Sequence, residues 1–307
     1  MDSAALETFL TVHRRGGVSA AADALARTQS AISRRLALLE QELGTPLFER
    51  IGRRLVLSEA GRALLPHAER VAAAVVDACA AVDAVKTGTS GITRVVVVGT
   101  LADGALARAL QRVRAQHPGL DVRLQTATSA EVSALVRTGD AAIGLRYFED
   151  RSADLDSRVI HEERLLVACA RSHPLAGRRV SALARLAGER WFAFPPRERR
   201  GEAFATTVFA QFMTRGIHEI DWIAIDSLTA QKRLVESGLG IALLQASAVD
   251  DELAQNRLAT IRVSDLQATV PVVRLLRKGA FLGGAARELL RVLESRWQTS
   301  ARAVRRA

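Results

Sequence analysis

The fold is decided by residues 19–57, which read SAAADALARTQSAISRRLALLEQELGTPLFERIGRRLVL. This stretch predicts two short helices separated by a break at Arg27-Thr28. A hairpin is expected immediately afterwards, from Pro46 to Leu57. Two helices joined by a turn and followed by a hairpin form the outline of a winged helix-turn-helix.

The second helix of this unit has distinct apolar and polar faces. Thr28 is a suitable N-cap, and Gly44 followed by Pro46 is expected to end the helix. One face carries an apolar stripe at i, i+4, i+7 and i+11, which is expected to face a core. The stripe consists of Ile32, Leu36, Leu39 and Leu43.

The opposite face carries short or forked hydrogen-bonding side chains, which can meet base edges and phosphates in a DNA major groove. The candidate DNA contacts on and before this helix are Thr28, Gln29, Ser30, Ser33, Arg34 and Arg35. On the hairpin they are Arg50, with Arg53 and Arg54 expected at its tip. The alternative is a solvated polar face on an ordinary three-helix unit.

Over its whole length the chain resembles the LysR-type transcriptional regulators. The motif-rich part runs from Ala4-Leu-Glu-Thr-Phe-Leu-Thr-Val to Leu57-Ser-Glu-Ala-Gly61, and its most specific piece is Thr28-Gln-Ser-Ala-Ile-Ser-Arg-Arg. Position 30 is often proline in that family, and serine here adds a hydroxyl to a small residue. The resemblance implies DNA contacts at Gln29, Ser30, Ser33, Arg34 and Arg53.

The composition indicates a globular chain of more than one domain. The 307 residues exceed one typical domain, and 49% are apolar. The chain contains no apolar run long enough for a membrane span, and its start lacks the layout of a signal peptide. Cys79 and Cys169 are isolated in sequence, which suits a reducing cytoplasm. A cytoplasmic protein without membrane contact is therefore expected.

The net charge of +10 does not by itself locate a nucleic-acid site. Residues 1–88 hold 11 Lys and Arg against 10 Asp and Glu, so most of the excess lies later in the chain. Local clustering is more informative, since residues 27–54 hold six arginines against three glutamates.

A long helix is predicted from Ser58 to about Lys86. Its apolar residues alternate spacings of four and three, which is the seam of a coiled coil. The seam consists of Leu64, Ala68, Val71, Val75, Ala78, Val82 and Val85. The alternative is a helix that packs only on its own domain. The resemblance implies a linker that forms dimers through residues 58–89, and these dimers are expected to assemble into a tetramer, although the sequence itself does not distinguish the two states. A dimer would read a pseudo-palindromic double-stranded operator.

Strand and helix patterns alternate from residue 90 onward, which predicts a mostly parallel α/β sheet with helices on both faces. Strands are expected at 94–99, 121–126, 141–145, 165–170, 191–194, 222–225, 241–244 and 271–276. Helices are expected at 102–116, 130–138, 202–215, 228–237 and 285–297.

The resemblance implies that this part is a two-lobed effector-binding domain, like the periplasmic binding proteins. The expected domains are the all-α winged helix-turn-helix at 1–57, the linker at 58–89 and the effector-binding domain at 90–307. Lobe I comprises 90–160 and 268–307, and lobe II comprises 161–267.

Ligands of open parallel sheets bind at the carboxyl ends of strands, near helix N-termini. That rule selects Thr100, Thr128, Arg146, Tyr147, Phe194, Arg197, Asp226 and Ser227. The resemblance implies effector contacts at Thr100, Thr128, Ser129 and Arg146. Hydroxyls, helix ends and arginines together favour an anion.

Two features of these candidates leave alternatives open. Thr100-Leu-Ala-Asp103 and Thr128-Ser-Ala-Glu131 both match the capping box, so such hydroxyls could serve only as helix caps. The carboxylate of Asp226 would weigh against an anion if it lined the cleft.

No catalytic motif is apparent, and the six histidines are scattered. The sequence therefore predicts a non-enzymatic, sequence-specific DNA-binding regulator whose operator binding is modulated by a small, anionic co-inducer, with no metal or other cofactor. RNA polymerase is a candidate partner. The alternative is a solute-binding or ligand-sensing α/β protein without a gene-regulatory role, but such a protein would not need residues 1–57.

Overall fold

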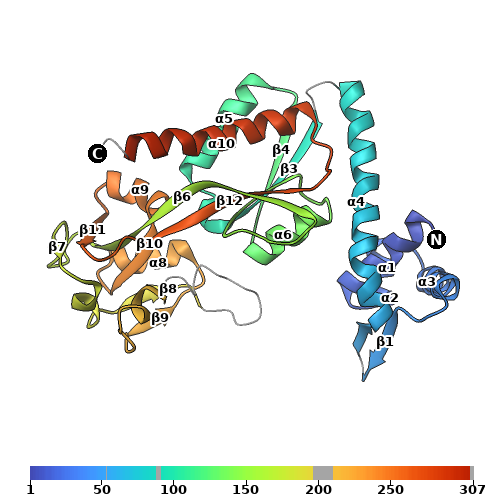
Figure 1. The fold of residues 1–307 in the computed structure, drawn as a ribbon, viewed down its shortest axis with the longest axis horizontal. Coiled ribbons are helices and arrows are strands. Elements are labelled where there is room, and N and C mark those ends of the chain that lie inside the picture. The colour runs from blue at the N-terminus through green and yellow to red at the C-terminus, as the bar shows by residue number, and fades with distance from the viewer. Residues whose placement is uncertain (53, 88–90, 196–209, 305–307) are drawn as a thin grey trace. The chain divides into compact units, whose positions relative to one another are not determined.

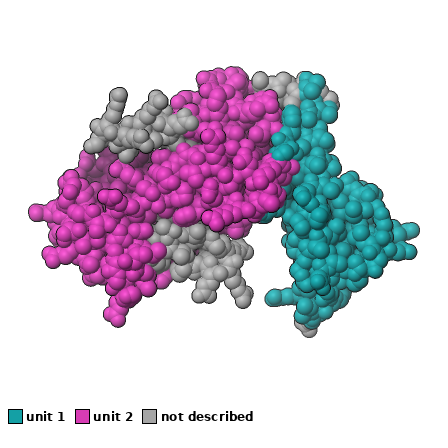
Figure 2. Space-filling model, viewed as in Figure 1, with its two compact units in different colours: residues 1–86, 137–140, 279–281 teal, residues 87–136, 141–278, 282–307 magenta. Residues whose placement is uncertain are grey.

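The computed structural model describes residues 1–52, 54–87, 91–195 and 210–304. The chain forms two compact units, drawn in different colours in Figure 2. The first unit is built mainly from residues 1–86, and the second from residues 87–136, 141–278 and 282 onward. No helix among the described residues is long and apolar enough to span a membrane.

Three helices begin the first unit (Figure 1): α1 (Ser3–Arg15), α2 (Val18–Ala24) and α3 (Gln29–Leu43). They pack around an apolar core because each presents one hydrophobic face. The core includes Leu6, Phe9, Leu10, Ala21, Ile32, Leu36 and Leu39, all of which are buried.

Helix α3 begins and ends at the capping residues that the sequence predicts. The Thr28 hydroxyl accepts a hydrogen bond from the Ala31 amide at 3.2 Å, and Gly44 ends the helix in the left-handed region at φ 70°. Leu43 is the one member of the predicted stripe that was wrong, since 40% of it is exposed. It lies in the last turn, where the helix ends at Gly44 and its side chain is not covered.

The expected hairpin is present as β1 (Phe48–Ile51) paired antiparallel with β2 (Arg54–Leu57). Gly52, at φ 61°, occupies the turn in a conformation that glycine adopts without strain. The ring of Phe48 lies 5.4 Å from that of Phe9, so α1 holds the base of this wing.

The long helix α4 (Glu59–Thr87) begins one residue after Ser58, as predicted. The Ser58 hydroxyl accepts from the Gly61 amide at 3.0 Å and donates to the Pro46 carbonyl at 2.7 Å. A Cβ at Gly61 would lie 2.1 Å from the Leu47 carbonyl oxygen, so this close approach needs glycine.

The seam residues of α4 divide into two groups. Ala68 is buried, and Leu64 packs against the core of α1 and α3. Farther along, Ala78 is exposed, and four valines are exposed by 42 to 87%. These four, Val71, Val75, Val82 and Val85, are called the valine row below.

The second unit contains one mixed sheet in the order β4-β3-β5-β12-β6-β10-β8-β9, with β11 also paired to β6. Its first half has β3 (Gly91–Val98) between β4 (Leu120–Ala127) and β5 (Ile143–Tyr147), all parallel. Three helices belong to this half: α5 (Gly104–Gln116), α6 (Ser129–Arg137) and α10 (Gly284–Val304).

The second half has β8 (Trp191–Ala193) between β10 (Ile241–Gln245) and β9 (Trp222–Ala224), again parallel. Its helices are α8 (Leu228–Glu236) and α9 (Ala246–Ala254). Strands β7 (Arg179–Val180) and β11 (Leu258–Val263) pair at its edge. Of the helix expected at 202–215, residues 202–209 lie outside the described residues, and 210–213 are helical.

Two antiparallel strands join the halves. Strand β6 (Leu155–Ala170) pairs with β12 (Thr269–Arg277) along its first part, and with β10 and β11 along its last six residues. The register shifts between Val272 and Val273, next to Ile160 on β6. Such a bulge bends a strand and increases its twist. A single strand is thus shared by both halves.

Candidate nucleic-acid interface and ligand cleft

The predicted DNA contacts of α3 are brought together on one exposed face. Gln29, Ser30, Ser33 and Arg34 are all exposed, and they follow the spacing that aligns side chains along a helix. The Thr28 hydroxyl is also exposed and lies 3.0 Å from that of Ser30. The Thr28 hydroxyl therefore already has a structural role as the N-cap of α3.

Arg35 is exposed but occupies a different side of the helix. At about 100° per residue, it lies about 100° from Arg34, at the edge of the exposed face next to the apolar stripe. A DNA contact by Arg35 stays a prediction.

The wing presents two further arginines. Arg50 on β1 and Arg54 on β2 are exposed, while Arg53 lies outside the described residues. Within the part of the chain that the structure describes, neither Arg50 nor Arg54 forms an ion pair, and nor do Arg34 and Arg35 of α3. Uncompensated guanidinium groups beside a polar helix face suit a phosphate backbone.

A cleft of about 710 Å³ lies in the second unit, at the carboxyl ends of the parallel strands. Both halves of the sheet contribute to it, as the strand-end rule predicts. Five of the predicted effector contacts line it: Thr100, Thr128, Tyr147, Phe194 and Asp226.

Arg146 does not line the cleft. Its guanidinium donates to the Ser133 hydroxyl and to Asp150 at 3.2 Å, and its Nε donates to the Tyr147 carbonyl. Adjacent residues of a strand point to opposite faces, so the placement of Tyr147 in the cleft turns Arg146 away from it. Burial raises the pKa of Asp150, but hydrogen bonds from Ser133 and Ser152 and the charge of Arg146 outweigh burial and leave this pKa below its usual value.

Three other predicted contacts are not part of the described lining. Ser129 is 4% exposed in the first turn of α6. Ser227 caps α8 by accepting from the Ala230 amide at 3.3 Å, which is the capping role left open above. Arg197 lies outside the described residues.

Thr100 and Tyr147 form the inner wall. The Thr100 hydroxyl donates to the Tyr147 hydroxyl at 3.3 Å. Burial raises the pKa of the Tyr147 phenol above its ordinary value, so it is a neutral hydrogen-bonding group at physiological pH.

Three helix N-termini at the cleft are already capped by the chain's own carboxylates. Asp103 accepts from the Leu106 amide at 2.8 Å, so it caps α5. The Thr100–Asp103 capping box was wrong, because Thr100 lies in a separate 3-10 turn, Gly99–Leu101. The second predicted box is confirmed, since Glu131 accepts from both the amide and the hydroxyl of Thr128.

At α9 the capping carboxylate comes from the shared strand. Glu163 on β6 accepts from the Ser247 amide at 3.1 Å and is only 3% exposed. Burial raises the pKa of Glu163, against the lowering effect of the Ser247 hydrogen bonds.

The lining also contains polar residues that sequence reasoning missed. They are Asp103, Thr126, Glu131, Thr229, Lys232, Ser247 and Asp251. The strand-end rule applied to β10 would have indicated its following residues, but α9 was not predicted, so Ser247 and Asp251 were overlooked. Lys232 lies 2.7 Å from Glu252 and donates to the Ala248 carbonyl. Its charge is therefore already neutralised.

Comparisons with known proteins bear on both sites. Residues 3–62 match the family model described as the bacterial regulatory helix-turn-helix protein of the lysR family. Residues 86–298 match the LysR substrate binding domain. The two models together cover the candidate interface and the candidate cleft.

Two relatives match most of the chain. The RuBisCO operon transcriptional regulator of Allochromatium vinosum is 27% identical over 281 residues, covering 92% of this chain and 91% of its own. The "Probable hydrogen peroxide-inducible genes activator" of Mycobacterium avium is 30% identical over 260 residues, covering 83% of this chain and 81% of its own. Both are named as regulators rather than as solute-binding proteins.

Solved structures share the fold along the whole chain. CbnR, a LysR family transcriptional regulator, is 25% identical with a TM-score of 0.64, over 97% of this chain and 99% of that chain. Full-length CbnR complexed with its target DNA is 25% identical with a TM-score of 0.55, over 96% of this chain and 99% of that chain.

Proposed function

Since the chain belongs to the LysR-type transcriptional regulator family, we propose that α3 reads an operator and that the cleft of the second unit senses a small molecule. The chain is a DNA-binding regulator of transcription with an effector-binding domain. Its relatives are regulators, and the proposal assigns no reaction and no metal or other cofactor to the cleft. A regulator of this kind acts where the bacterial chromosome lies, which in this proposal is the cytoplasm.

The observation that carries the DNA-binding role is the exposed polar face of Gln29, Ser30, Ser33 and Arg34. These side chains stand at the N-terminal end of a helix whose opposite face is buried in a small core. In the complex that we propose, this end of α3 enters the major groove, where glutamine and arginine can pair with base edges. The wing arginines then contact phosphates and fix the orientation.

Self-association is proposed through α4, where the valine row is exposed along the predicted coiled-coil seam. Pairing two such helices would bury these side chains and bring two copies of α3 to one duplex. A two-fold protein then calls for a pseudo-palindromic operator. Further assembly to a tetramer and contact with RNA polymerase complete the proposal.

Regulation is proposed to arise from the two halves around the cleft. A ligand that touches both Thr128 and Asp226 binds a closed arrangement better than an open one, because only the closed one allows both sets of contacts. A change in closure would re-space the paired DNA-binding units and alter DNA bending and polymerase access.

The test is binding of the purified full-length protein to its own promoter region at low ionic strength. Footprinting should reveal two protected half-sites in successive turns of one face of the duplex. An unprotected promoter region, with the protein folded by circular dichroism, would reject the regulatory role.

A further inference from the structure

Most of the positive charge of the chain has no part in the function proposed above. Residues 1–88, which include α3 and the wing, hold 11 Lys and Arg against 10 Asp and Glu, so the net charge of +10 comes almost wholly from later residues. Among these, residues 166–188 contain four arginines and no aspartate or glutamate. A local excess of one sign of charge attracts partners of the opposite sign.

Part of this arginine-rich segment runs beside β11. The Gly177 amide donates to the Thr260 carbonyl at 2.9 Å, and the Arg171 guanidinium donates to the Asn256 side-chain oxygen at 2.6 Å. Strand β7 then pairs with β11 in parallel. Arginines from three neighbouring segments are thereby brought to one edge of the second unit. They are called the basic edge below and are Arg171, Arg178, Arg179 and Arg262.

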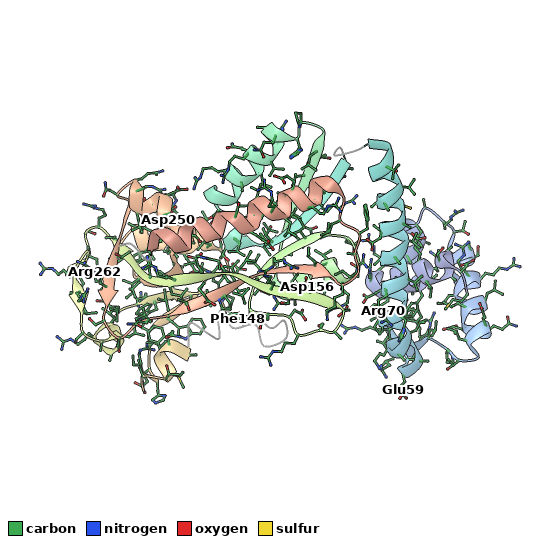
Figure 3. All side chains as sticks on the ribbon, turned by 45° about the horizontal axis from the view of Figure 1, so that its top comes forward. Glu59, Arg70, Phe148, Asp156, Asp250 and Arg262 are labelled. Carbon is green, nitrogen blue, oxygen red and sulfur yellow. The ribbon has the colours of Figure 1, made fainter. Side chains whose placement is uncertain are left out.

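The pairing of β7 with β11 places two of these charges side by side. Arg179 is in register with Arg262, which Figure 3 labels at the end of the second unit that β7 and β11 form. The next register pair, Val180 with Val263, packs against the core, so the arginines face solvent by strand alternation, and both are exposed. Like charges directly opposite each other destabilise a sheet. The stability of the sheet therefore does not explain this pair.

Within the ranges that the structure describes, no carboxylate neutralises the basic edge. Arg178 and Arg179 form no side-chain hydrogen bond or ion pair there. Arg262 donates to the Gly177 carbonyl at 3.0 Å and Arg171 to Asn256, so both donate to neutral oxygens. All four guanidinium groups keep their full charge at an exposed surface.

The carboxylates on adjoining segments already have other partners. One follows β11, one precedes β8, and one lies on α9. Each lies within 3.5 Å of a basic side chain outside the basic edge. The pairs are Asp265 with Arg215, Glu189 with His173, and Glu252 with Lys232.

A phosphate backbone is the partner that this surface fits. The planar guanidinium fork matches the oxygens of a phosphate, and exposed cations that bind phosphates release counterions from the nucleic acid. Contacts of this kind add affinity and fix position without reading sequence. Duplex DNA is also the polyanion to which the helix-turn-helix family of this chain binds.

We propose that the basic edge is a second DNA-contacting surface, which binds backbone phosphates of duplex DNA whatever their sequence. It goes beyond the proposed function, in which α3 and the wing supply all contacts with DNA. It does not depend on α3 reading an operator, because its contacts carry no sequence information.

The test measures how DNA affinity depends on salt. Full-length protein is titrated onto a labelled duplex of scrambled sequence, and fluorescence anisotropy gives the affinity at several salt concentrations. Arg178→Gln with Arg179→Gln should reduce the slope of log affinity against log salt by about 2, and Arg262→Gln alone by about 1. An unchanged slope in both variants would overturn the proposal.

The control removes two equal charges from another surface. Arg112 and Arg114 are exposed on α5 and likewise form no ion pair with a described residue. Arg112→Gln with Arg114→Gln should leave the salt slope unaltered. The same fall in both double variants would assign the effect to net charge and overturn the proposal. Thermal unfolding should match the wild type in the Arg178 and Arg179 variant, because neither side chain forms a bond there.

An acidic protein segment is the other partner that the test must separate. Labelled polyglutamate is titrated onto the same proteins at the same salt concentrations. We expect the double variant of the basic edge to lose more affinity for the duplex than for polyglutamate. A larger loss for polyglutamate would overturn the proposal and assign the surface to an acidic protein.

Operator preference keeps this inference distinct from the proposed function. The ratio of operator affinity to scrambled-duplex affinity should be the same in the wild type and in the double variant of the basic edge. A wild-type protein without operator preference, whose salt slope still falls on loss of Arg178 and Arg179, retains the basic edge and loses the role of α3. A protein that prefers its operator but keeps its slope in the variants retains the role of α3 and loses the basic edge.

Discussion

The Ser58 hydroxyl donates a hydrogen bond of 2.7 Å to the carbonyl of Pro46, twelve residues earlier. The same hydroxyl caps α4 by accepting from the Gly61 amide. One side chain therefore joins the two ends of the wing segment and caps the linker helix α4. Glu59, labelled in Figure 3, is the first residue of that helix. The position of the wing beside α3 depends on this closure.

Replacing Ser58 by alanine should destabilise the first unit. Loss of an N-cap costs about 1 kcal/mol or somewhat more, and the Pro46 carbonyl also loses its donor. Urea unfolding followed by circular dichroism measures the change, with Ser58→Thr as the variant that retains a hydroxyl. Equal stability of the alanine and threonine variants would contradict the capping role.

Removing the forked side chains of α3 should relax sequence preference. Gln29→Ala and Arg34→Ala are each expected to lower operator affinity by about 1–3 kcal/mol, while affinity for unrelated DNA changes less. Arg123→Ala is a matched control for the lost charge, since Arg123 pairs with Asp121 on the surface of β4 and with no other described carboxylate. Fluorescence anisotropy on operator and scrambled duplexes separates the two effects.

A wing arginine should act on every sequence alike. Arg54→Ala should weaken binding to operator and to scrambled DNA together, and reduce the slope of log affinity against log salt by about 1. An unchanged salt slope would remove the phosphate contact from Arg54. Arg53 can be tested in the same titration.

The valine row should be needed for self-association. Val71→Asp with Val75→Asp places charges in the middle of the predicted seam, and monomers with poor operator affinity are expected because a buried unpaired charge is costly. Val159→Asp is the control, since this valine is 39% exposed on β6 and is not part of the predicted seam. A dimer of the double variant by light scattering would dismiss the seam.

The buried carboxyl of Glu163 should give the second unit a recognisable pH dependence. Burial raises its pKa above the usual value, so the folded state binds its proton more tightly than the unfolded state. The stability contributed by the protonated form is present below pH 4.5 and is lost as pH rises through the raised pKa. Glu163→Gln should lack this fall while still accepting from Ser247, which pH-resolved thermal unfolding can check.

The DNA-binding unit was largely predictable because its signals are local. The caps at Thr28, Gly44 and Ser58 and the apolar periods lie within single elements, and all three caps are present. The prediction that Leu43 is buried was wrong. Its burial depends on which residues cover the last turn of α3, and the apolar periodicity of the helix carries no information about them.

The cleft was harder to predict because its geometry depends on long-range pairing. Most of the first ten residues of β6 are polar or charged, so the sequence did not predict a strand there. They form a strand because they pair with β12. Which of two adjacent residues faces the cleft follows from register, and that choice placed Tyr147 inside and Arg146 outside. The acidic lining combines four separate elements and has no signature in any one of them.

The 16-residue strand β6 has a consequence for how the second unit can be divided. Each half uses part of this strand in its own sheet hydrogen bonding. A gene fragment encoding either half alone would therefore leave unpaired backbone N–H and C=O groups at the edge of its sheet. The halves should consequently melt in a single step and resist separate expression. Any motion of the two halves around the cleft must therefore bend the paired strands β6 and β12 near Ile160, where the register shifts. It cannot be a free rotation about a flexible linker.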